Sequence, residues 1–278
     1  MAIKIPITEN RTLKQLREHY EIEKKLANRL RNATQAERKY LYNSLYDELF
    51  RRVPHHPQLT RKVSSKISDK KLAQRMRFLN GFLSPDAIFL EIGAGDCRLA
   101  FEIAKRVKKI YAIDTSKEIV VNESCPKNFE LIIFDGVSIP VPESSISIAY
   151  SDQLMEHLHA EDAFEQLGNV YKALKKTGIY ISITPNRLSG PHDISKYFDP
   201  VATGFHLKEY TNIELMKLFR KVGFSKVAPY MDGRLVPNLA PLIFYETLLG
   251  ILPHYLRTKV LKKLSYHALF SIVRVGEK

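Results

Sequence analysis

The chain has 278 residues, of which 45% are hydrophobic and 26% charged, with a formal net charge of +13. This size predicts a globular protein with one sizeable domain plus additions, or two small domains. No uncharged apolar run of membrane-spanning length occurs, and the start "MAIKIPITENRTLKQ" lacks the apolar core of a secretory signal, so we expect a cytoplasmic protein. The two cysteines, Cys97 and Cys125, form no CxxC pair, which argues against a disulfide framework or a cysteine-based zinc site.

The basic charge is concentrated at the two ends of the sequence. Residues 1–80 hold 19 basic and 8 acidic side chains, residues 81–250 hold 18 and 21, and residues 251–278 hold 6 and 1. A basic surface suits RNA, an anionic membrane or an acidic substrate, and it is also what a solvated helical face looks like. No RNA-binding motif accompanies the charge, so the sequence disfavours a nucleic-acid partner without excluding one.

Taken in chain order, the first predicted elements are two amphipathic helices within residues 10–53. Leu13, Leu16 and Tyr20 recur at helical spacing in the first, and Leu41, Leu45 and Leu49 in the second. Before the second helix, "TQAE" has the spacing of a capping box. The prolines of "VPHHPQ" at 53–58 predict a loop after it.

From residue 70 onward, helical and strand patterns alternate. A helix at 69–83 precedes a buried strand at 87–93, a helix at 97–107 and a strand at 109–114. Strands follow at 129–135 and 145–151, then a helix at 163–178 and a strand at 178–186. Such alternation predicts a mostly parallel sheet covered by helices on both faces, with the ligand at the carboxyl ends of the strands.

The carboxyl-terminal part departs from this alternation. A helix and strand at 211–230 and a last strand at 267–276 leave residues 232–265 between the final two strands. This segment contains "LAPLIFYETLLGILPHYL", whose apolar run is interrupted by Pro241, Glu246 and Pro253 and is too short to cross a bilayer. It is interpreted as an apolar lid over the site, a helix on a membrane surface or an ordinary packed helical hairpin.

The stretch "LEIGAGDCRLAFEIAKRVKKIYAID" at 90–114 describes a nucleotide-binding turn. A dinucleotide fingerprint would need a third glycine at position 98, where Arg98 stands. The alternative frame has Glu91 on the strand, Gly93 and Gly95 in the turn, and Asp114 at the end of the next strand. Glycines at these positions let the backbone turn sharply and approach a ligand closely.

This frame resembles motif I of the class I S-adenosylmethionine-dependent methyltransferases, and residues 70–230 resemble their type 11 branch. The resemblance implies a Rossmann-like, doubly wound, seven-stranded, mostly parallel sheet. An amino-terminal helical extension (1–69) would precede a methyltransferase domain (70–278) with a lid-like helical insertion at 232–265. The third glycine of the family pattern is Cys97 here; because that glycine chiefly serves close packing, we expect the small side chain to be tolerated.

The same resemblance implies S-adenosylmethionine as cofactor and assigns roles to single residues. Glu91 would position the charged amino acid end, and Asp114 would accept hydrogen bonds from the ribose hydroxyls. Asp135 would accept from the adenine amino group, and the backbone at Gly136 and Val137 would meet the ring nitrogens. The predicted cofactor-binding residues are Glu91, Gly93, Ala94, Gly95, Asp114, Thr115, Asp135, Gly136 and Ser151.

Candidate catalytic side chains lie in "YSDQLMEHLH", after the fourth strand. Gln153, Glu156 and His157 would share one side of a helix that begins there, and His206 in "GFHLKEYT" can join them across the cleft. This layout resembles ubiquinone-pathway O-methyltransferases and small-RNA 2′-O-methyltransferases, in which an ExxEH element and a distant histidine hold a divalent metal. Because Gln153 replaces the first glutamate, we predict Glu156, His157 and His206 as catalytic residues and assign no metal ligand.

Two other interpretations of these side chains stay open: they organise the floor of the site, or they do hold a metal. His192 and Asp193 in "SGPHDIS" form a further pair, which we expect to be solvated and leave outside the prediction. The favoured function is methylation of a hydroxyl on a small molecule such as a metabolite, a sugar or a lipid-like compound. The amino-terminal helices and the 232–265 insertion would form the acceptor pocket, with peripheral membrane contact as a variant. The alternatives are an RNA methyltransferase and a non-catalytic cofactor- or partner-binding protein; the sequence does not indicate the oligomeric state.

Overall fold

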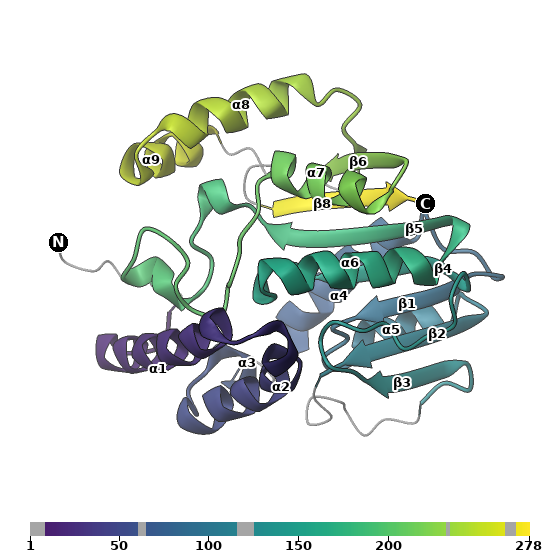
Figure 1. The fold of residues 1–278 in the computed structure, drawn as a ribbon, viewed down its shortest axis with the longest axis horizontal. Coiled ribbons are helices and arrows are strands. Elements are labelled where there is room, and N and C mark those ends of the chain that lie inside the picture. The colour runs from purple at the N-terminus through teal and green to yellow at the C-terminus, as the bar shows by residue number, and fades with distance from the viewer. Residues whose placement is uncertain (1–8, 61–64, 116–124, 232–233, 265–270) are drawn as a thin grey trace.

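The computed structural model describes residues 9–60, 65–115, 125–231, 234–264 and 271–278. Its centre is an eight-stranded sheet in the order β3-β2-β1-β4-β5-β8-β6-β7 (Figure 1). The strands are β1 (Ile88–Ile92), β2 (Lys109–Asp114), β3 (Phe129–Ile133), β4 (Ile146–Asp152), β5 (Leu174–Pro185), β6 (Lys226–Met231), β7 (Arg234–Leu235) and β8 (Ser271–Glu277).

The strand order reverses beside β1, which pairs in parallel with both β2 and β4. The pairs β2–β3 and β4–β5 are parallel as well, whereas β8 runs antiparallel to both β5 and β6. The predicted mostly parallel, Rossmann-like sheet is therefore confirmed, and the reversal beside β1 is where such sheets bind ligands. The expected number of seven strands was wrong, because β7 adds an eighth strand, which pairs antiparallel with β6. This strand is only two residues long, too short to give an alternating pattern in the sequence.

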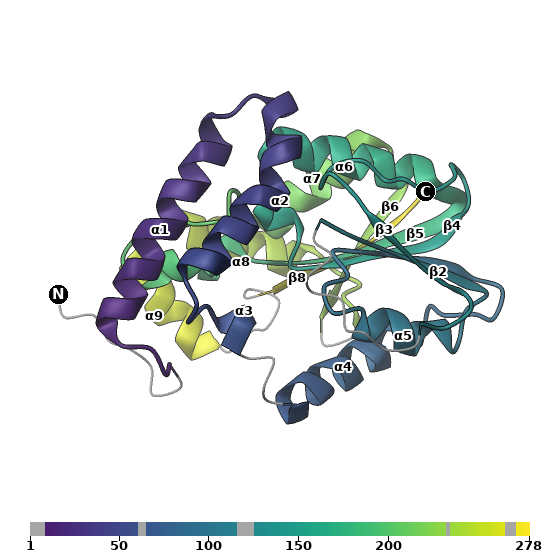
Figure 2. The same cartoon turned by 90° about the horizontal axis from the view of Figure 1, so that it is seen from below.

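Helices cover both faces of the sheet. α4 and α5 lie on one face, and α6 and α7 lie on the other (Figure 2). Each face has its own hydrophobic cluster, one around Phe89 and Ile110 and one around Leu90 and Ile113, as expected when alternate residues of a buried strand point to opposite sides. These helices are α4 (Ser65–Leu79), α5 (Arg98–Ala104), α6 (Ala160–Ala173) and α7 (Asn212–Val222).

The amino-terminal extension forms the helices α1 (Leu13–Asn32), α2 (Gln35–Arg52) and the short α3 (Pro57–Thr60), which begins within the predicted loop at 53–58. Capping boxes begin both long helices, at Thr12 and at the predicted Thr34. The extension shares its core with the sheet, because Leu26, Leu45 and Leu49 belong to the same hydrophobic cluster as the strand residues Ile92 and Ile113.

A buried ion pair ties this extension to α6. Arg38 in α2 donates to Asp162, with 2.6 Å between Arg38 Nε and Asp162 Oδ2, and the Tyr42 hydroxyl donates to the same carboxylate at 2.5 Å. Arg38 and Asp162 are 2% and 0% exposed, so the charges compensate each other away from water. Part of the basic charge of the first 80 residues therefore serves packing.

Two helices, α8 (Ala240–Ile251) and α9 (His254–Leu264), lie between β7 and β8 along one side of the sheet (Figure 1). The buried Glu246 carboxylate of α8 accepts hydrogen bonds from the Asn186 side chain and from the backbone and side chain of Asn212. Residues 232, 233 and 265 of the predicted insertion and residues 267–270 of the predicted last strand lie outside the described residues. Among the described helices, none is long and apolar enough to cross a membrane.

Candidate active site

The turn after β1 has the backbone geometry that its glycines predict. Gly93 has φ +73° and Gly95 has φ +54°, a left-handed region that residues with a Cβ rarely occupy. The Gly95 N–H donates to Asp114 Oδ2 at 2.8 Å. This hydrogen bond connects the turn after β1 with the acidic end of β2, the two segments that are predicted to bind the cofactor.

Cys97, directly before α5, stands where the family pattern has its third glycine, which was expected to serve close packing. Its side chain is fully buried, and its φ is +56°, so the position requires a left-handed backbone as well as close packing. The packing explanation was thus incomplete: a glycine would fit here for its backbone freedom too. Burial raises the pKa of the Cys97 thiol to about 12, which keeps it protonated at neutral pH.

Glu91 lies beneath this turn with one unsatisfied oxygen. The residue is 5% exposed, and Glu91 Oε2 has no hydrogen-bond partner among the described residues. Burial raises the pKa of the Glu91 carboxyl to about 8, against the opposing charge of Arg75 from α4. A buried, unpartnered carboxylate oxygen suits the cationic amino group that the cofactor carries at its amino acid end.

The other predicted cofactor residues surround the same end of the sheet with mixed outcomes. Ala94 is buried, and Thr115 is half-buried directly after Asp114. Ser151 is buried with its hydroxyl 2.7 Å from the Tyr180 hydroxyl, so it already has a partner inside the protein. The Ala94 N–H donates to the Ile113 carbonyl oxygen at 3.2 Å, so it is also used inside the protein.

The loop at Asp135 corrects one expectation. Asp135 Oδ1 accepts hydrogen bonds from the backbone N–H groups of Val137 and Ser138, at 2.8 and 2.7 Å. The Val137 N–H is therefore already used inside the loop. At Gly136, with φ +87°, a Cβ would come within 3.2 Å of the Tyr42 ring, so α2 of the extension covers this end of the site.

The three predicted catalytic side chains come together. One ligand-type atom each of Glu156, His157 and His206 lies within 4.8 Å of the other two. Glu156 is fully buried in the 3-10 turn Met155–His157, where its Oε2 accepts from the Thr184 hydroxyl at 2.9 Å and its Oε1 has no partner among the described residues. The expected helical face with Gln153 was wrong, because Gln153 precedes this turn with φ +58° and is exposed.

Hydrogen bonds orient the two imidazoles. His157 Nδ1 lies 3.1 Å from the Phe205 carbonyl oxygen, and His206 Nδ1 lies 2.7 Å from Glu209 Oε1. Both oxygens can only accept, so we assign the Nδ1 proton in each ring, which leaves Nε2 of each neutral ring as an acceptor. The Tyr46 hydroxyl, 2.8 Å from His157 Nδ1, adds a contact from α2.

The surroundings of Glu156, His157 and His206 shift the pKa values of these three side chains in different directions. Burial lowers the pKa of His157 to about 3, with a further contribution from the nearby His206. Burial also raises the pKa of the Glu156 carboxyl to about 7. For His206, burial acts downward, but the hydrogen bond to Glu209 and the charge of Glu156 outweigh it and raise the pKa of the imidazole. Divergent acidities in one cluster are typical of functional sites.

The loop after β5 contradicts the expectation that its histidine and aspartate are solvated. Asp193 is 9% exposed and accepts hydrogen bonds from the backbone N–H groups of Ser195 and Gly204 at 3.0 and 2.9 Å. His192 is half-buried and contacts the Ser189 hydroxyl at 2.9 Å. The loop is thus a packed wall of the site.

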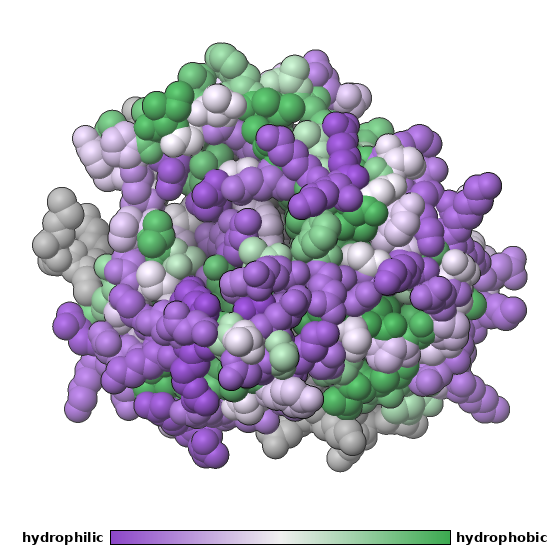
Figure 3. Space-filling view, viewed as in Figure 1, coloured by the Kyte–Doolittle hydropathy of each residue, from purple (hydrophilic) through white to green (hydrophobic). Residues whose placement is uncertain are grey.

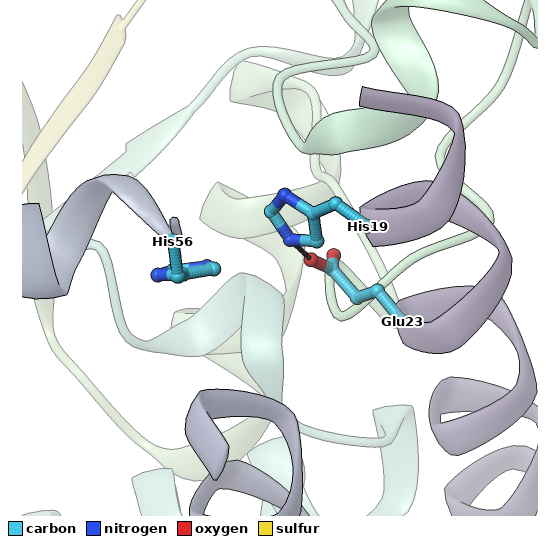
Figure 4. Close-up of side chains that lie close together, drawn as sticks. All are labelled: His19, Glu23 and His56. Carbon is cyan, nitrogen blue, oxygen red and sulfur yellow. Dashed lines mark hydrogen bonds and ion pairs between the residues drawn. The ribbon is translucent and has the colours of Figure 1, made fainter. Parts of the chain in front are cut away.

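Sequence reasoning missed a second cluster, formed by His19 and Glu23 of α1 and by His56 before α3 (Figure 4). The His19–Glu23 spacing of four residues on a predicted helix was the available signal. His19 Nε2 lies 2.7 Å from Glu23 Oε2, the Phe205 N–H donates to Glu23 Oε1, and Arg11 donates to His19 Nδ1. Every polar atom of His19 and Glu23 therefore has a partner, and the pair ties α1 to the segment that carries His206.

A cavity of about 200 Å³ lies between the two clusters. It is walled by the amino-terminal helices on one side and by the loops after β4 and β5 on the other. Burial lowers the pKa of His56 to about 3, so this imidazole is neutral at the cavity wall. The lining residues include His19, Glu23, Tyr46, His56, His157, His192, Asp193, Phe205 and His206.

The doubly wound sheet, the glycine turn and the acidic ends of β1 and β2 define the class of this protein as a class I methyltransferase fold. Residues 90–182 match the family model Methyltransf_11, described as a methyltransferase domain. This match, together with the fold, identifies the chain as an S-adenosylmethionine-dependent methyltransferase. No curated protein matches the chain.

Solved structures share this fold at low sequence identity. One is a methyltransferase in complex with the Haloferax volcanii Trm112 methyltransferase activator, with a TM-score of 0.54 and 13% identity over 76% of this chain and 92% of that chain. Another is a SAM-dependent methyltransferase from Archaeoglobus fulgidus, with a TM-score of 0.50 and 19% identity over 75% and 94%. A third is Haemonchus contortus phosphoethanolamine N-methyltransferase 2 with S-adenosyl-L-methionine, with a TM-score of 0.51 and 17% identity over 76% and 52%.

Proposed function

We propose that this methyltransferase methylates a hydroxyl group of a small acceptor held in the cavity between the amino-terminal helices and the β4 and β5 loops. The observation that carries the proposal is that Glu156, His157 and His206 each place one ligand-type atom within 4.8 Å of the other two, while Glu156 Oε1 has no partner among the described residues. A hydroxyl oxygen placed there finds acceptors for its proton on several sides. The 200 Å³ volume favours a small acceptor, since pockets for drug-sized ligands begin at about 300 Å³.

In this mechanism the protein positions the acceptor and removes its proton. The cofactor sulfonium supplies the methyl group and already contains a good leaving group, so little else is required of the chain. His206 is the proposed base: its Nδ1–H is held by Glu209, and its Nε2 would accept the proton of the acceptor hydroxyl. Tyr46 and His157 also line the cavity and would orient the acceptor.

The test measures transfer of a deuterated methyl group from S-adenosylmethionine to a panel of phenols, sugars and short-chain alcohols, read by mass spectrometry. His206→Ala should lower turnover by about 100-fold or more, the usual contribution of a general base, while the affinity for S-adenosylhomocysteine stays unchanged. His159→Asn is the matched control, because His159 caps α6 and is not among the residues that line the cavity. If His206→Ala weakens product affinity and turnover in parallel, His206 has a structural role and the proposal fails.

A second candidate mechanism uses a divalent cation at the same three side chains. It is favoured by the unpartnered Glu156 Oε1 and by the second hydrogen bond that orients each ligand: Thr184 for Glu156, Phe205 for His157 and Glu209 for His206. A bound cation would lower the pKa of the acceptor hydroxyl. Metal analysis of the purified protein, with activity before and after chelation, separates this mechanism from the metal-free one.

An RNA acceptor draws less support. Besides Arg38, Arg31 is committed inside the protein, because its guanidinium donates to the carbonyl oxygens of Thr203 and Gly204 at 2.8 Å each. An RNA substrate would make turnover fall steeply with salt, whereas the proposed small acceptor predicts turnover that changes little between low and moderate ionic strength.

A further inference from the structure

The helix α8 lacks the polar outer face that surface helices usually have. Leu242 and Leu249 point into the protein, where they form a small cluster with Leu188. On the opposite side, Phe244 and Ile251 are 60% and 76% exposed. An ordinary surface helix is apolar on one side only, and a helix that is apolar on all sides is normally covered.

The neighbouring helix α9 continues this exposed apolar area. Its Tyr255 is 61% exposed, and hydrophobic residues gather at the top of the molecule where α8 and α9 lie (Figure 3). Exposed apolar side chains that occur singly need no explanation, but a contiguous group on two adjacent helices marks an interaction site. We call this group the α8–α9 surface; it consists of Phe244, Tyr245, Leu248, Ile251, Tyr255, Leu256 and Val260.

Basic side chains border the α8–α9 surface. Lys259 is exposed in α9 beside Tyr255, and Arg257 of the same helix is half-buried. Next to the surface is a cavity of about 410 Å³, whose lining includes Gly250 of α8 and three cationic side chains, Arg187, Lys208 and Arg257, together with His206 and the acidic Glu209. The combination of exposed tyrosines, aliphatic side chains and flanking cations is typical of segments that lie in the headgroup region of an anionic bilayer.

One of these cations is incompletely satisfied. Arg257 Nε is buried and has no hydrogen-bond partner among the described residues, although Arg187 on the same cavity wall is paired with Glu214. Burial, and after it the like charge of Arg187, lower the pKa of Arg257, so an anion in this cavity would be complementary to both guanidinium groups.

We propose that the α8–α9 surface docks on anionic lipid membranes. Phe244, Leu248 and Ile251 enter the boundary between headgroups and acyl chains, while a lipid phosphate occupies the cavity beside Arg257. The docking does not depend on which acceptor the enzyme methylates. The observations that carry it are the apolar outer side of α8, the continuation of that side into α9 and the cations around it.

The experiment is co-sedimentation of the full chain with vesicles of phosphatidylcholine, with and without phosphatidylglycerol. The wild type should bind the anionic vesicles more tightly than the neutral ones, and added salt should weaken that binding. The double variant Phe244→Ser/Ile251→Ser should bind anionic vesicles about tenfold or more weakly, because two apolar side chains no longer leave water. Arg257→Gln should lower binding to anionic vesicles by about fivefold and leave neutral vesicles unaffected.

The matched control is Tyr40→Ser/Phe164→Ser, which removes two exposed aromatic side chains from α2 and α6. It should bind vesicles like the wild type. Circular dichroism of each variant checks that the fold is retained, and all substituted aromatic and aliphatic side chains are partly exposed. The proposal is overturned if the wild type does not sediment with anionic vesicles, or if both double variants bind equally. It is also overturned if light scattering finds a dimer that only the α8 variant dissociates, since a second copy would then cover this surface.

Discussion

Replacing Glu91 by glutamine should stabilise the protein while weakening its cofactor binding. Glu91 is buried, one of its carboxyl oxygens has no partner among the described residues, and its pKa is raised from 4.5 to about 8. Between these two pH values the folded protein binds a proton that the unfolded chain does not, so stability falls as the pH rises through this window. At pH 7 the cost is about 3 kcal/mol, at about 1.4 kcal/mol per pH unit above the ordinary pKa.

Glu91→Gln removes this titration, although the amide keeps an unsatisfied group of its own. We therefore expect a gain in the free energy of unfolding of about 1–3 kcal/mol at pH 7, growing from pH 5 to pH 8. Urea denaturation of both proteins at several pH values measures the gain, and calorimetry with S-adenosylmethionine measures the expected loss of affinity. A pH-independent difference, or a variant less stable than the wild type at pH 8, would refute the reasoning.

Three further predictions concern packing around the site. Cys97→Gly should stay within about 1 kcal/mol of wild-type stability in urea, because relief of the left-handed backbone offsets the lost side chain. This variant should also keep the cofactor affinity, whereas Cys97→Leu should lower both stability and affinity. A loss above about 2 kcal/mol for the glycine variant would contradict this. Asp162→Asn should lower the free energy of unfolding by about 3–5 kcal/mol, because it leaves Arg38 buried and unpaired, and adding Arg38→Met should recover part of this loss. A loss below about 1 kcal/mol for Asp162→Asn alone would contradict the prediction. Glu246→Ala should destabilise the fold by about 2–4 kcal/mol, because it leaves the donors of Asn186 and Asn212 without an acceptor, and Glu246→Gln should destabilise it less. Equal losses of stability for the two variants in thermal unfolding would contradict this and show that only packing matters.

The repeating parts of the fold could be predicted from the sequence because their signals are local. Apolar runs such as "AIFLEIG" predict the buried strands, and Thr34 with Glu37 predicts the start of α2. β7 could not be predicted, because two residues carry no period. The left-handed conformation of Cys97 was hidden for a different reason: only a resemblance indicates a glycine there, and the side chain that replaces it gives no sign of its backbone angle.

The residues of the candidate site that follow strand ends could be predicted from the sequence. Those that depend on how the amino-terminal helices pack against the loop after β5 could not. Glu156, His157 and His206 follow strands of the sheet, so their approach is a consequence of topology. The cluster of His19, Glu23 and His56 depends on how α1 and α3 pack against the β5 loop, which no local pattern encodes. For the same reason, the burial of Asp193 could not be read from its polar loop sequence.

The most direct test of the account is a crystal structure with S-adenosylhomocysteine. The proposed arrangement places the amino acid end of this product at Glu91 and the Gly93–Gly95 turn, the ribose at Asp114, and the sulfur at the cavity lined by His157 and His206. A sulfur atom facing that cavity would support hydroxyl methylation there. A product bound with its sulfur turned away from both histidines would contradict the central claim.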